Sequence, residues 1–111
     1  DGERYAAFLQ SADPLYLPRR CTVPLIVTAR LEKYREPTEA WLKAQGVKCE
    51  RLVMGPWPSL ADRCNVAEFK AQFYAESQCA LFVESCPQQA KQIALLTGKR
   101  VICPQTSEVI N

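Results

Sequence analysis

The feature that most constrains the fold of this chain is a regular alternation of short apolar segments with amphipathic segments of helical length. The apolar segments predict strands at Val23–Thr28, Cys49–Met54, Ala80–Glu84 and Arg100–Cys103. The amphipathic segments between them predict helices at Pro37–Gln45, Val66–Glu76 and Pro87–Thr97. Strands that alternate with helices of about ten residues are joined by crossover connections, which favours an α/β fold with a mostly parallel sheet.

Proline and glycine mark the ends of two of these helices. Pro37 and Pro87 fall in the first turn of a predicted helix, where a missing N–H costs nothing. Gly46 and Gly98 follow the helices and suit a left-handed stop. Pro24 lies near the start of the first strand, a position tolerated only at a strand beginning or at a sheet edge.

The first twenty residues differ from the rest of the chain. Glu3–Gln10 predicts a short helix with Tyr5, Phe8 and Leu9 on one side, and the proline-containing stretch ADPLYLPRR predicts an extended connection. A length of 111 residues is typical of one domain. We therefore expect a single domain over residues 1–111, with an N-terminal helix and connection at 1–20 and an α/β core at 21–111.

Composition excludes several classes of function. The chain has 14 Lys and Arg against 12 Asp and Glu, a balance that predicts neither a nucleic-acid nor a membrane-surface partner. No apolar run approaches the roughly 18 residues of a membrane span. The chain contains no histidine, which excludes Ser-His-Asp triads, Cys-His dyads and His-ligated metals within it.

Six cysteines raise the question of disulfides. No two lie closer than seven residues, so no C-x-x-C metal or redox motif is present, and four lie in or beside apolar segments. Together with a start, DGERYAAF, that lacks a signal-peptide pattern, this favours reduced thiols and a cytoplasmic protein. Cys86, at a predicted helix start, is the candidate for a reactive thiol; the alternative is that it is structural.

Three residues beside predicted strands could bind an anion. Thr28 ends the first strand, where its hydroxyl could bind a phosphate; the alternative is that it caps the turn. Lys70 precedes the third strand and could neutralise a phosphate or a carboxylate; the alternative is a solvated lysine. Glu84 ends the apolar run ALFVE, where a carboxylate must be paired, bound to metal or facing water.

The order of these residues resembles the second-to-fourth motifs of the haloacid dehalogenase-like (HAD) hydrolases. The stretches VTARLEKYREPTEAWLKAQGV and ALFVESCPQQAKQIALLTGKRVIC are most similar to the HAD-like region of bacterial proteins related to phosphoribosyltransferases. The resemblance implies a three-layer sheet with helices on both faces. It also implies phosphoryl transfer from a small phosphorylated substrate with Mg²⁺ and an aspartyl nucleophile. By resemblance, Thr28 and Lys70 would bind the phosphate and Glu84 would help bind Mg²⁺.

The chain departs from this pattern at the nucleophile. The family's first motif, D-x-D on an apolar strand, is absent, and Glu84 is followed by Ser85 and Cys86 rather than by a second acid. We therefore expect a catalytically incomplete HAD-like domain, the fragment or remnant of a phosphatase-like hydrolase. The alternatives are a non-enzymatic interaction module that keeps the scaffold and a redox-responsive protein that uses Cys86.

The missing strand also bears on assembly. In the HAD-like order it would lie between Val23–Thr28 and Ala80–Glu84, which leaves unpaired backbone groups that are costly to bury. Direct pairing of these two strands, a fill by Tyr5–Leu17 and a strand from another chain are the three solutions. Of these we expect a homodimer that shares sheet edges or their apolar surroundings.

Two further segments allow two interpretations each. The charged run LEKYRE is either a clamp over substrate or a solvated helix start. Trp57, between two prolines, is either an anchor for a partner or a ring folded back over the core.

Overall fold

The computed structural model describes residues 21–111, which fall into two compact units divided between Asp62 and Arg63. Each unit contains helices and strands, so the expected α/β class is confirmed for the described part of the chain. The single domain over residues 1–111 stays a prediction, and the predicted helix Glu3–Gln10 lies outside the described residues.

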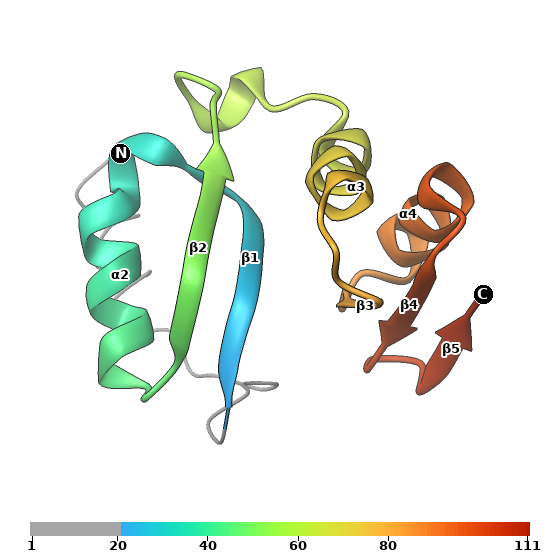
Figure 1. The fold of residues 1–111 in the computed structure, drawn as a ribbon. Helices are drawn as coiled ribbons and strands as arrows, with labels where there is room; N and C mark the ends of the chain where they lie inside the picture. The colour runs from blue at the N-terminus through green and yellow to red at the C-terminus, as the bar shows by residue number, and fades with distance from the viewer. Residues whose placement is uncertain (1–20) are drawn as a thin grey trace. The chain divides into compact units, whose positions relative to one another are not determined.

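The first unit is a pair of parallel strands with one α-helix between them in sequence (Figure 1). Its elements are β1 (Thr22–Leu31), the 3₁₀ turn η1 (Glu32–Tyr34), α2 (Arg35–Ala44), β2 (Lys48–Gly55) and the 3₁₀ turn η2 (Leu60–Asp62). The buried apolar side chains come from both strands, from α2 and from the turn after it: Val27, Leu31, Trp41, Val47 and Met54. α2 starts two residues before Pro37, the predicted start, and ends one residue before Gln45, the predicted end.

Glycine ends α2 as the sequence predicts. Gly46 has φ +73°, the left-handed conformation in which a residue without Cβ is least strained. Its N–H donates to the carbonyl of Lys43, and the N–H of Val47 donates to the carbonyl of Leu42. The chain therefore turns sharply from α2 into β2, with Val47 buried at the turn.

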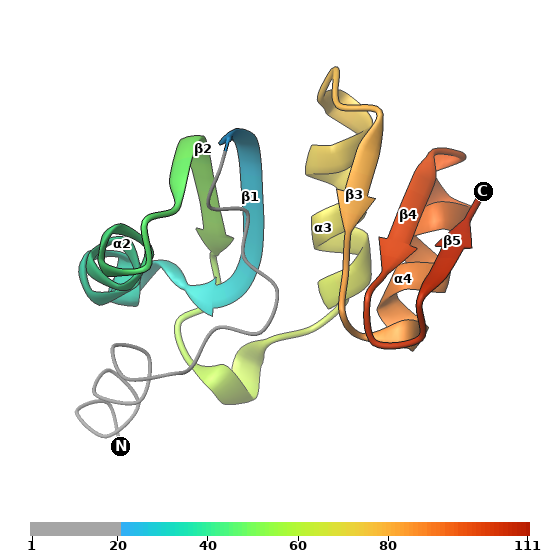
Figure 2. The ribbon, with the colours of Figure 1, turned by 90° about the horizontal axis from the view of Figure 1, so that it is seen from below.

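The second unit is a three-stranded sheet with two helices on one face (Figure 2). Its elements are α3 (Val66–Glu76), β3 (Leu81–Val83), α4 (Pro87–Thr97), β4 (Arg100–Cys103) and β5 (Glu108–Ile110). β3 pairs parallel with β4, and β4 pairs antiparallel with β5. The predicted bounds of α3, α4 and β4 are confirmed.

Tyr74 is the centre of the second unit's core. Its side chain is fully buried among small residues of α3 and α4 and beside Val101 and Cys103 of β4. The phenol O–H donates to the carbonyl of Arg100 at 2.6 Å. Lys99 closes the end of α3, since its ammonium donates to the carbonyls of Tyr74 and Ser77 and lies 4.2 Å from the centre of the Tyr74 ring.

The strands and sheets differ from the prediction in three respects. β5 was not predicted, and the described strands form two sheets, with β1 paired to β2 and β3 paired to β4. β3 is also shorter than the predicted Ala80–Glu84, because the chain turns toward α4 at Glu84. Glu84 keeps one hydrogen bond to the neighbouring strand, from its N–H to the carbonyl of Ile102. Parallel pairs make up two of the three pairings in these residues, so the mostly parallel character is confirmed there.

Two further expectations from the sequence concern the state of the cysteines and membrane-spanning segments. All six cysteines lie in the described part of the chain, and all six are free thiols. No helix in residues 21–111 has the length and apolar character that crossing a membrane requires.

Candidate functional site

Lys70 and Glu84 form an ion pair in the second unit. The Lys70 Nζ lies 2.7 Å from Glu84 Oε1, and the two side chains keep only 12% and 8% of their exposure. Lys70 comes from the second turn of α3, and Glu84 directly follows β3. Of the readings that the sequence left open, a solvated lysine and a water-facing glutamate are therefore wrong, because each is buried against the other.

Two further groups complete this cluster. The ammonium of Lys70 also donates to Gln89 Oε1 at 3.0 Å. The backbone N–H of Cys86, at the start of α4, donates to Glu84 Oε2 at 3.0 Å. Both carboxylate oxygens are thus engaged, and the negative charge lies at the helix N-terminus, where the helix dipole favours it. We call Lys70, Glu84, Cys86 and Gln89 the Lys70 cluster.

The Lys70 cluster has one property of an anion site. An ammonium has three N–H donors, and two of these go to Glu84 and Gln89. The third can donate to an oxygen of a bound anion such as phosphate. Because the cation is fixed between two acceptors, it loses little side-chain entropy when it binds such an anion.

The same cluster is a poor magnesium site. Mg²⁺ prefers near-octahedral oxygen coordination, usually with waters and one or two carboxylates. Glu84 is the one carboxylate of the cluster, both its oxygens accept hydrogen bonds, and a cation is 2.7 Å away. In residues 21–111 no group of three or more His, Cys, Asp or Glu could hold a metal ion. These residues alone do not fit Mg²⁺.

Thr28 lies in the first unit, at an irregular part of β1. Between Val27 and Leu31, β1 advances by four residues while its partner β2 advances by two, so β1 forms a bulge that includes Thr28 and Arg30. Thr28 Oγ1 accepts a hydrogen bond from the N–H of Arg30 at 3.1 Å. The hydroxyl therefore caps the turn, the alternative reading of the sequence, while its own proton can still be donated to an anion.

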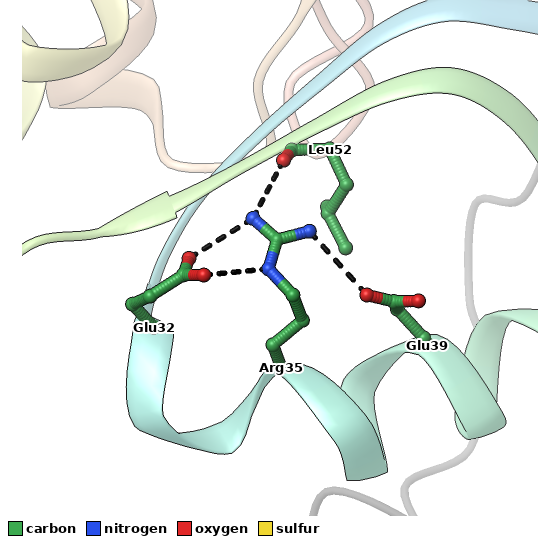
Figure 3. Close-up of polar contacts among 4 residues, drawn as sticks. All are labelled: Glu32, Arg35, Glu39 and Leu52. Carbon is green, nitrogen blue, oxygen red and sulfur yellow. Dashed lines mark hydrogen bonds and ion pairs between the residues drawn. The ribbon is translucent and has the colours of Figure 1, made fainter.

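The charged run after β1 forms the start of a helix that ion pairs and a hydrogen bond to β2 hold in place. Arg35 binds Glu32 through both carboxylate oxygens, at 2.6 and 2.9 Å, and Glu39 at 3.4 Å (Figure 3). The guanidinium also donates to the carbonyl of Leu52 in β2 at 2.9 Å. Hydrogen bonding to Arg35 lowers the pKa of the Glu32 carboxyl, and the pKa of the Arg35 guanidinium is raised by the same contact.

The sequence did not single out Arg35 or Gln89. The spacing of Glu32, Arg35 and Glu39 is the usual i, i+3 and i+4 spacing of helix ion pairs and could have indicated the first. No sequence signal points to Gln89 as a partner of Lys70.

A surface cavity of about 420 Å³ lies beside this helix start. Its lining combines basic side chains, Arg35, Lys43 and Lys48, with acidic ones, Glu39 and Glu50. None of Thr28, Lys70 and Glu84 contributes to it. Its mixed charge selects no particular ligand.

Trp57 folds back onto its own strand. A Cβ built on Gly55 would lie 2.7 Å from the Trp57 ring, so the ring packs on the glycine at the end of β2. This is the second of the two interpretations of Trp57. Cys86 is half-buried and directly precedes α4 as its N-cap residue.

Comparison of the chain with family models, with curated proteins and with solved structures found no match. The likeness to HAD-like hydrolases therefore rests on the sequence motifs alone.

Proposed function

We propose that this chain is part of an HAD-like domain that binds the phosphate of a small phosphorylated ligand and lacks the catalytic nucleophile in the sequence given. The single observation that supports the proposal is the Lys70–Glu84 pair. It brings together the lysine before the third predicted strand and the acid at the end of that strand, the two residues to which the resemblance gives the phosphate and Mg²⁺ roles. In this proposal the function of Lys70 is to hold the phosphate, whereas a phosphate contact of Thr28, in the first unit, stays a prediction from the sequence.

The finer fold belongs to the same proposal. We infer a three-layer sheet with helices on both faces, completed by a strand from outside the described residues. In its support, β1 and β3 each have one sheet neighbour among residues 21–111, so each has an edge available for a further strand. Mg²⁺ binding at Glu84 requires additional oxygen ligands from outside these residues.

Titration with inorganic phosphate tests the ligand. Backbone amide resonances of Cys86 and of the first turn of α4 are expected to shift with phosphate, and Lys70→Met is expected to abolish the shifts. Lys91→Met is the matched control, since Lys91 is an exposed lysine of α4. Equal responses of the two variants, or no response of the wild-type protein, would refute phosphate binding at Lys70.

An activity assay tests the missing nucleophile. The chain as given is expected to release no phosphate from a generic aryl phosphate with Mg²⁺, because loss of a nucleophile removes many orders of magnitude of rate. Turnover that Lys70→Ala abolishes would show that a nucleophile is present.

A second candidate function is a non-enzymatic interaction module. The observation that favours it is a group of exposed apolar side chains on the sheet of the second unit, Leu81, Val83 and Val109. This function predicts self-association or binding of another chain without any effect of phosphate.

A further inference from the structure

We propose that Glu84 occupies the anion position of the Lys70 cluster and competes there with phosphate, so that the unliganded chain keeps its own phosphate site filled. This inference rests on the proposed function, because it concerns the regulation of that same site. It gives Glu84 the role of an internal competitor that sets the affinity for the ligand.

Two donors of the Lys70 cluster are of the kind that binds phosphate. One is the ammonium of Lys70, and the other is the backbone N–H of Cys86 at the N-terminus of α4. Both donate to Glu84, since Lys70 Nζ lies 2.7 Å from Oε1 and the N–H of Cys86 lies 3.0 Å from Oε2. The carboxylate therefore takes the two positions at which oxygens of a bound phosphate would accept hydrogen bonds.

The backbone around Glu84 keeps this carboxylate at the site. The N–H of Glu84 donates to the carbonyl of Ile102 at 2.9 Å, which fixes the residue at the end of β3, and its side chain is 8% exposed. A group tethered to the chain has a much higher effective concentration at the site than a free ligand in solution. The affinity for phosphate is therefore reduced by the small fraction of molecules in which Glu84 has left Lys70.

The cluster also contains what a phosphate needs in order to displace Glu84. Lys70 has one N–H donor beyond those to Glu84 and Gln89, and this donor gives the phosphate a first contact. A phosphate monoester carries a charge of about −1.5 to −2 at pH 7, so it attracts the ammonium more strongly than a carboxylate does and repels the carboxylate beside it. Gln89 is neutral and can keep its hydrogen bond to Lys70 after Glu84 has left.

Phosphate titration of Glu84→Gln tests the competition. The substitution removes the charge and keeps the shape and one acceptor oxygen of the side chain. The affinity for inorganic phosphate, read from the amide resonance of Cys86, is expected to rise at least about tenfold over the wild type. Glu68→Gln is the matched control, because it removes an exposed carboxylate from the first turn of α3, the helix that carries Lys70. Salt screens such a charge, so this control is expected to change the affinity less than about twofold.

A measurement on the wild-type chain does not depend on how well Glu84→Gln folds. The side-chain carboxyl carbon resonance of Glu84 is expected to shift as inorganic phosphate is added at constant pH. Its midpoint is expected to match that of the Cys86 amide, because the carboxylate leaves both of its donors when phosphate binds. A Glu84 resonance that stays in place while the Cys86 amide shifts would overturn the competition.

The titrations also separate this inference from the proposed function. If the wild type binds phosphate through Lys70 and Glu84→Gln binds it no more tightly, the proposed function stands and the competition is wrong. If neither the wild type nor Glu84→Gln binds phosphate, the phosphate site itself is absent and both proposals fail.

Discussion

Lys70 and Glu84 join α3 to the end of β3 across fourteen residues of sequence, and their charged atoms lie 2.7 Å apart with little access to water. A charge pair in such a place is costly to form, because both ions lose hydration. Here Gln89 and the N–H of Cys86 supply further hydrogen bonds that offset this cost. Substitution of either residue is therefore expected to affect both the stability of the second unit and the proposed phosphate binding.

Lys70→Met leaves Glu84 buried without its cation. Removal of one partner of a buried pair costs about 3–5 kcal/mol, and we expect a loss near 3 kcal/mol in the free energy of unfolding in urea. Lys70→Met/Glu84→Leu is expected to recover part of this loss, since neither charge remains. The exposed control Lys91→Met is expected to stay within about 0.5 kcal/mol of the wild type. A loss no larger in Lys70→Met than in this control would contradict a buried pair.

Tyr74→Phe removes a hydrogen bond from the core. The carbonyl of Arg100 loses the phenol as a donor, and we expect a cost of about 1–2 kcal/mol in the free energy of unfolding. Burial raises the pKa of Tyr74, so the folded protein holds this proton more tightly than the unfolded chain. The contribution of Tyr74 to the free energy of unfolding is complete below about pH 10, the ordinary pKa of tyrosine. It is lost as the pH rises through the higher pKa that Tyr74 has in the folded state.

The pH dependence of stability tests this account of Tyr74. Unfolding free energies of the wild type and of Tyr74→Phe, measured from neutral to alkaline pH, are expected to converge above about pH 10. A difference that does not change with pH would contradict the raised pKa of Tyr74, because the phenol donates to the carbonyl of Arg100 only while it is protonated.

Gly55→Ala tests the packing at the end of β2. The added Cβ would lie 2.7 Å from the Trp57 ring and 2.9 Å from the carbonyl oxygen of Ala29, so the ring or β1 must move. We expect a loss of about 1–3 kcal/mol and a change in tryptophan fluorescence, as for other overpacked sites. Gly55→Ala/Trp57→Leu is expected to recover part of the loss. Unchanged fluorescence in Gly55→Ala would show that Trp57 does not rest on this glycine.

The helices of the second unit were the elements that sequence predicted best. Pro87 and Gly98 mark both ends of α4, and local geometry alone sets these limits. β5 was missed because its three residues follow a turn and carry no apolar run, so its place in the sheet depends on pairing with β4. Sequence periodicity does not record such pairing.

In the candidate site too, the sequence indicated residues with a local signal and missed contacts that depend on tertiary packing. Lys70 and Glu84 could be singled out because a charge beside an apolar run must be explained, and the structure brings them together. Gln89 could not be, because a glutamine in an amphipathic helix is ordinary. Its contact with Lys70 follows from the packing of α4 beside α3. Thr28 was placed at a strand end, but the bulge that surrounds it arises from the register of β1 against β2.

The last prediction concerns the reactivity of the cysteines. Burial is the main cause that raises the pKa of Cys49, the nearby charge of Glu39 raises it further, and Arg35 acts in the opposite direction. Because the thiolate is the reactive form, a higher pKa means less thiolate at a given pH and slower alkylation. Cys49 is therefore expected to react with iodoacetamide more slowly than the exposed Cys21 and Cys64, as followed by peptide mass spectrometry over time. Glu39→Gln is expected to speed the reaction of Cys49 while the rates of the other two stay the same. Alkylation of Cys49 at the rate of the exposed thiols would show that this part of β2 opens to solvent.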